Sequence, residues 1–147
     1  MEAYCVYAST KFVSQVFYDY GEGFSQENSI LIHDCFAEEK DVHFTVNVPQ
    51  GVKQIRIDPC SYRCAVTVKD IVAGEQHFAK NNITVNGAWA NENCVIFDTE
   101  DPNLVFACEG ADRLDVTLEV VELPASLTAT LIEAVTPKEN GLKRFFH

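Results

Sequence analysis

The sequence predicts an all-β fold, an antiparallel β-sandwich of jelly-roll type with about eight or nine strands and a short C-terminal helix. Apolar and polar residues alternate with a period of two along several segments. Turn-forming Gly, Pro, Asn and Asp residues separate these segments at spacings of about ten residues. No long helical pattern alternates with them, which disfavours a doubly wound α/β fold. The 147 residues correspond to one domain.

The alternating segments predict half-buried strands, because residues at every second position of a strand share a face. In segment 43–48, for example, Phe44, Val46 and Val48 fall on one face. Similar alternation, or a shorter apolar run, predicts nine strands in all, at 12–18, 29–32, 43–48, 54–58, 65–71, 83–85, 95–97, 104–107 and 113–120.

A short helix is expected at about 126–134, because four apolar residues recur at intervals of four around and after Pro124: Leu123, Leu127, Leu131 and Val135. The alternation of Leu127, Ala129 and Leu131 would also suit a strand. We expect the sandwich and helix to occupy 1–135, with 136–147 as a tail or linker to a neighbouring domain. The phenylalanines at its end, Phe145 and Phe146, either pack back on the core or mark chain that leads on to that neighbour.

Composition and charge bound the function. With 47% hydrophobic and 22% charged residues, the chain is globular rather than disordered. Its formal charge of −11 repels phosphate backbones and anionic membranes, so no nucleic-acid partner is expected. No signal peptide and no apolar run long enough to span a membrane is visible. We therefore expect a cytoplasmic protein without membrane insertion.

The six cysteines are expected to be reduced thiols, because a domain of this size needs no disulfides. Only Cys60 and Cys64 are closely spaced, and they could hold half of a zinc site if two more ligands came from elsewhere. The sequence has no H-x3–5-H partner for them, no dinucleotide fingerprint and no phosphate-binding loop. We expect neither a metal nor another cofactor.

Two acidic clusters, Asp19–Glu22–Glu27 and Asp98–Glu100–Asp101, could bind calcium or act as an acid and base pair. Neither matches an EF-hand loop. A glycoside hydrolase needs two carboxyl groups at a defined separation, and no nucleophile motif accompanies these residues. No catalytic residue is assigned.

The most distinctive stretch runs from Gln15 to Ser29, with a Phe-Tyr-Asp run, two glycines and Phe24 before a Ser-x-Glu-x-Ser pattern. Arg-Ile-Asp-Pro follows at 56–59, and Asp-Pro at 101–102. This ordered combination, over roughly 15–121, resembles a β-sandwich accessory domain attached to bacterial glycosyltransferases and rhamnan-synthesis-type proteins. The resemblance implies a non-catalytic, carbohydrate-binding-like module of a cell-surface polysaccharide glycosyltransferase. The segment Cys60-Ser61-Tyr62-Arg63 departs from that pattern, so the resemblance says nothing of this loop.

A sandwich that binds sugar generally uses an exposed aromatic ring as a stacking platform, with amide side chains around it. Trp89, the single tryptophan, follows the turn at Asn86-Gly87 in a polar segment and is the first candidate. It could equally be a lid on the core. Asn86 and Asn91 are the accompanying amides, and Tyr20 and Tyr62 are secondary aromatic candidates. The turn glycines at 21 and 23 are more simply explained by a strand reversal than by a ligand loop.

The predicted function is therefore carbohydrate binding, with a glycan or a neighbouring glycosyltransferase domain as partner. A structural or protein-docking domain that binds no glycan is the alternative. A glycoside hydrolase is the third possibility.

Overall fold

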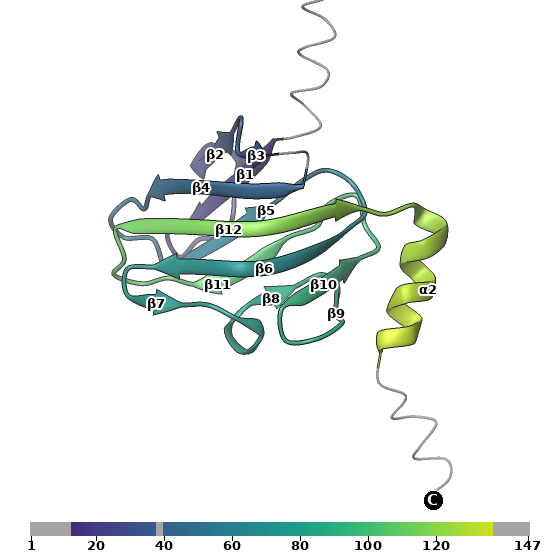
Figure 1. Ribbon diagram of the computed structural model, residues 1–147. Helices are drawn as coiled ribbons and strands as arrows, with labels where there is room; N and C mark the ends of the chain where they lie inside the picture. The colour runs from purple at the N-terminus through teal and green to yellow at the C-terminus, as the bar shows by residue number, and fades with distance from the viewer. Residues whose placement is uncertain (1–12, 38–39, 137–147) are drawn as a thin grey trace, which may run out of the picture.

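The computed structural model describes residues 13–37 and 40–136 and confirms the all-β sandwich with a C-terminal helix. Two antiparallel sheets face each other, and the helix stands beside the end at which β12 ends (Figure 1). Five strands form the first sheet, here called sheet A, in the order β2 (Ser29–Ile32), β1 (Ser14–Asp19), β5 (Gln54–Asp58), β11 (Leu104–Ala107) and β8 (Thr84–Val85).

Sheet B contains the other seven strands of the described residues. Its main path runs β3 (Phe36–Ala37), β4 (Asp41–Asn47), β12 (Arg113–Glu122), β6 (Cys64–Ala73), β10 (Cys94–Phe97) and β9 (Ala88–Trp89). β7 (Gln76–His77) pairs with the far end of β6. The two ten-residue strands, β6 and β12, lie side by side at the centre of this sheet (Figure 1).

The nine predicted strands all exist, with boundaries shifted by a few residues. The expected total of eight or nine is too low, because three further strands, β3, β7 and β9, bring the described part of the chain to twelve. Each of the three has only two residues. A strand that short has no periodicity to detect, and it exists only because a longer neighbour offers its backbone groups.

The core lies between the sheets and is built from the inward residues of the alternating strands. The largest side chains among those with less than 2% exposure include Phe97, Ile55, Ile57, Leu104 and Leu118. Phe78, from the segment after β7, packs its ring against Phe106 of β11 at a centroid distance of 4.5 Å. At about 25 cal/mol per Å² of apolar surface, this burial is the main source of stability.

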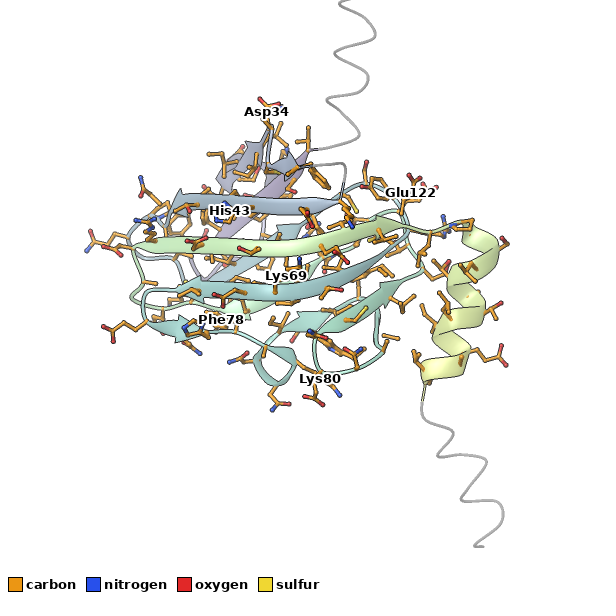
Figure 2. All side chains as sticks on the ribbon, viewed as in Figure 1. Asp34, His43, Lys69, Phe78, Lys80 and Glu122 are labelled. Carbon is orange, nitrogen blue, oxygen red and sulfur yellow. The ribbon has the colours of Figure 1, made fainter. Side chains whose placement is uncertain are left out.

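The outer face of sheet B is polar and interrupted by one bulge. The pairing of β12 with β6 shifts between Thr117 and Leu118, which leaves Lys69 as an extra residue of β6. Lys69 and His43 lie on this exposed face (Figure 2). The ammonium of Lys69 is 3.9 Å from carboxylate oxygens of both Asp41 and Glu119. Such exposed pairs contribute little stability, and they leave this face of the sheet charged.

Helix α2 (Ala125–Val135) begins directly after Pro124, one residue from the predicted start, and packs against β10 and β9. Only Thr128 of the helix is fully buried. Among the described residues, no helix is long and apolar enough to cross a membrane. Of the predicted tail 136–147, only Thr136 belongs to the described residues, and Phe145, Phe146 and Cys5 fall outside them.

Candidate functional site

The structure distributes the five predicted site residues over three places. β1 begins beside the Asp58 end of β5 and ends beside Gln54. Tyr20 directly follows β1, whereas Tyr62 follows β5, so the two tyrosines lie at opposite ends of the sandwich. The other three predicted residues belong to the segment around β9 at the edge of sheet B.

Trp89 lies in strand β9 rather than in a loop. It pairs with Val95 of β10, and directly paired residues project to the same face of a sheet. Val95 is fully buried, so the indole is directed toward the core, where it is half-buried and packs against the core cluster. The arrangement is that of a lid at the open edge of the sandwich.

The predicted amides are engaged by their own backbone surroundings. Asn86 donates from Nδ2 to the carbonyl oxygen of Asp101 at 2.8 Å and accepts at Oδ1 from the backbone N–H of Asn103 at 2.9 Å. The Oδ1 atom of Asn91 accepts the backbone N–H groups of Asn93 and Cys94, both at 2.9 Å. These bonds fix two turns around β9.

Tyr62 is half-buried against the core, whereas Tyr20 is 40% exposed. Tyr20 is therefore the most exposed of the three predicted aromatic residues. Its ring adjoins Gly51, where an added Cβ would lie 3.6 Å from the Cδ1 atom of Tyr20.

The turn after Tyr20 is held by the carboxylate of Asp19. Its Oδ1 atom accepts the backbone N–H groups of Gly21 at 2.7 Å and Gly23 at 2.8 Å. Both glycines have positive φ, 112° and 93°, a conformation that side chains with a Cβ rarely adopt. The backbone N–H of Lys53 donates to the carbonyl oxygen of Asp19 at 2.8 Å, which places the lysine beside this turn. The carboxylate of Asp19 therefore stabilises the turn through these hydrogen bonds.

Lys53 is a residue that the sequence did not single out. Its side chain lies along Gly21, with Cδ, Cε and Nζ 3.6–3.7 Å from where a Cβ of that glycine would be. Within the described residues, its ammonium group has no ion pair. We call the exposed residues Tyr20, Gly21, Gly51 and Lys53 the Tyr20 surface. It combines an aromatic ring, an unpaired cation and small residues that leave the ring accessible.

A second cluster joins the three separate motifs on which the family resemblance rested. Arg56 donates from Nε and Nη2 to the two carboxylate oxygens of Asp58, at 2.7 and 2.8 Å. Its guanidinium lies over the ring of Phe17, 4.5 Å from the ring centroid, and 3.7 Å from Asp101. Phe17 of β1 is on the outer face of sheet A, and Arg56 covers it because the register places the two opposite each other.

The electrostatics of this cluster indicate a structural role, in which the charged groups bind one another rather than a ligand. Burial, opposed by Arg56 and reinforced by the neighbouring Asp101, raises the pKa of Asp58. The hydrogen bond to Asp58 raises the pKa of Arg56. Because the guanidinium already contacts two carboxylates and an aromatic face, it offers few donors to a ligand.

The later acidic loop holds helix α2. One oxygen of Asp98 accepts the hydroxyl of Thr128 at 2.6 Å and the Nε–H of Arg63 at 3.0 Å. These two hydrogen bonds, the one from Thr128 first, lower the pKa of Asp98. Arg63 also lies 3.4 Å from Glu100. Asp98 thus serves as the anchor of the helix.

No group of three or more His, Cys, Asp or Glu side chains in 13–37 and 40–136 could hold a metal ion. The five cysteines in these ranges are free thiols. Cys60 and Cys64 lie with their sulfur atoms 3.5 Å apart, and both are buried.

Comparison with family models, with curated proteins and with solved structures finds no match to this chain.

Proposed function

We propose that the chain is a non-catalytic accessory module that binds carbohydrate, and that it serves a bacterial cell-surface polysaccharide glycosyltransferase in the cytoplasm. The Tyr20 surface is the observation that supports binding. Tyr20 presents a 40% exposed ring on a turn that Asp19 fixes, and aromatic faces of this kind stack on the apolar faces of sugars. The exclusively thiol state of the described cysteines supports a reducing compartment.

The sugar-binding proposal is tested by affinity electrophoresis through gels that contain a panel of bacterial polysaccharides. Tyr20→Ala should abolish the retardation of the protein, and Tyr20→Phe should retain it, because the aromatic face is kept. Leu31→Ala is the matched control, since Leu31 is also an exposed apolar residue, at 50%, but lies on β2 near the other end of β1. Retardation of Tyr20→Ala equal to that of the wild type would exclude the Tyr20 surface.

A docking function has an observation of its own. Val121 at the end of β12 and Leu127 in α2 are 42% and 41% exposed, and α2 carries a single charged residue, Glu133. Exposed apolar residues beside an element with few charges fit a protein contact, because the centre of such a contact is depleted of charged residues. Val121→Asp and Leu127→Asp should weaken co-purification with a transferase domain from the same reading frame, whereas Leu31→Asp should not. If the chain is a docking domain that binds no glycan, the wild-type protein should bind no polysaccharide in the panel.

The same panel tests the hydrolase alternative. Release of reducing sugar from a polysaccharide, lost in an Asp101→Asn variant, would show catalysis and contradict the non-catalytic proposal.

A further inference from the structure

Two thiols meet inside the connection between β5 and β6. Cys60 follows Pro59, and Cys64 is the first residue of β6. Their sulfur atoms are 3.5 Å apart, and the residues are 5% and 0% exposed. Among the cysteines that the structure describes, this is the one thiol–thiol contact. Cys35, for comparison, bonds to the hydroxyl of Ser14 and to a carbonyl oxygen.

The backbones of the two cysteines are held to different degrees. Cys64 is fixed at the start of the central strand β6, where it pairs with Phe97 of β10 on one side and Glu122 of β12 on the other. Cys60 lies in an irregular segment, and its thiol also approaches the carbonyl oxygen of Tyr62 at 3.5 Å. A disulfide requires sulfur atoms about 2.05 Å apart, so the approach needed is about 1.5 Å and can come from Cys60 alone.

We propose that Cys60 and Cys64 are an oxidation site that a peroxide converts to an intramolecular disulfide. The thiolate of Cys60 attacks one oxygen of hydrogen peroxide, breaks the O–O bond and becomes a sulfenic acid, and the released hydroxide takes up a proton as water. The sulfur of Cys64 then attacks the sulfur of Cys60, and the sulfenic hydroxyl leaves as a second water with the proton from Cys64. The two thiols lose two electrons and the peroxide gains them.

The order of the steps follows from exposure and position. Cys60 is the more exposed of the two residues, so we expect the first step there, after the loop opens, since buried thiols react slowly. The second step needs no encounter because Cys64 is already in contact. The contact with Cys60, and then burial, raise the pKa of Cys64, which keeps that sulfur a thiol and directs the peroxide to Cys60. Because the sulfur of Cys64 is already in contact with that of Cys60, we expect little sulfenic acid to accumulate.

The test uses the full chain, reduced and then treated with hydrogen peroxide at neutral pH, with and without the sulfenic-acid trap dimedone. Remaining thiols are alkylated and the protein is digested with trypsin. Cleavage after Arg56, Arg63 and Lys69 places Cys60 in peptide 57–63 and Cys64 in peptide 64–69. The disulfide is therefore read directly, as a link between two peptides that reductant separates.

In the wild type we expect the 57–63 to 64–69 link and little dimedone adduct. In Cys64→Ser we expect no link and at least about tenfold more dimedone on Cys60, because the resolving sulfur is missing. Cys108→Ser, which removes another buried cysteine, should behave as the wild type. Two results for the wild type would each overturn the proposal. In the first, Cys60 and Cys64 both remain alkylatable while Cys94, the less buried cysteine, is oxidised. In the second, Cys60 of the wild type carries a stable dimedone adduct. If Cys64→Ser or Cys108→Ser folds poorly, the peptide mapping of the wild type still decides the question.

Discussion

At the scale of single residues, a substitution of Trp89 distinguishes a lid on the core from an exposed platform for sugar binding. The indole packs on the core, so Trp89→Ala should lower the free energy of unfolding by about 2–4 kcal/mol, and Trp89→Phe by less. Urea unfolding measures both changes. Leu127→Ala, at an exposed position, should stay within about 0.5 kcal/mol. As the single tryptophan, Trp89 should also give blue-shifted fluorescence. Red emission and an undisturbed stability would contradict the lid role.

Gly87 carries a second prediction, because the turn before β9 passes very close to β10. A Cβ at this position would collide with the carbonyl oxygen of Ile96 and lie 2.8 Å from Cδ1 of Phe97. Gly87→Ala should therefore destabilise the protein by about 2 kcal/mol or more, by overpacking. Gly23→Ala is the control. It has positive φ but no atom within 4 Å, so only backbone strain of about 1–2 kcal/mol applies. Equal costs in thermal unfolding would argue against the steric explanation.

At the scale of elements, helix α2 depends on one anchor. Thr128 is its fully buried residue and donates to Asp98 at 2.6 Å. Thr128→Val keeps the shape but removes this hydrogen bond. We expect faster amide exchange over 125–135 while the exchange of β6 and β12 is unchanged. Thr130→Val, on the exposed side of the helix, should have no such effect.

The same anchor gives a pH dependence whose sign can be worked out. The folded pKa of Asp98 is lowered, so its contribution is present above the ordinary carboxyl pKa and is lost as the pH falls through the folded value. The protection of the α2 amides, measured relative to their intrinsic exchange rates, should therefore fall on acidification below about pH 4, before the sandwich opens. Thr128→Val should flatten this dependence. An exchange rate of α2 that parallels the sandwich at every pH would contradict the anchor.

The elements also show what the sequence could and could not predict. Burial of one face imposes a period of two on a strand and a spacing of three to four on a helix, so the longer strands and the helix were predictable. The short strands β3, β7 and β9 were not, because their longer neighbours create them. The contacts around the candidate site were not predictable, because they depend on pairing between segments that are distant in the sequence. The contact of Phe17 with Arg56 follows from the β1–β5 register, and the position of Lys53 from its bond to Asp19. Neither separation along the chain nor composition encodes that register.

At the scale of the whole molecule, we expect association to involve the edge of sheet A that has no pairing strand within the described residues. β2 is an edge strand of sheet A, and its Ile30 and Leu31 are 44% and 50% exposed. It contains no Pro, Lys or bulge, the features that usually protect an edge. Leu31→Lys should therefore reduce self-association in sedimentation at high concentration without lowering thermal stability. Thr45→Lys makes the same charge change on the exposed face of β4, and an equal reduction there would point to net charge instead.

The position of β12 has a consequence for synthesis of the chain. It is the last strand of the described residues, yet it lies between β4 and β6 and pairs with both. Until residue 122 has left the ribosome, these two earlier strands have no partner between them, and the backbone edges that will face β12 stay unpaired. Such long-range pairing closes slowly. The nascent chain, at a synthesis rate of about 5–20 residues per second, must therefore wait several seconds with its central sheet open. Aggregation in the cell should accordingly depend on chaperones that engage the growing chain rather than on the stability of the finished fold.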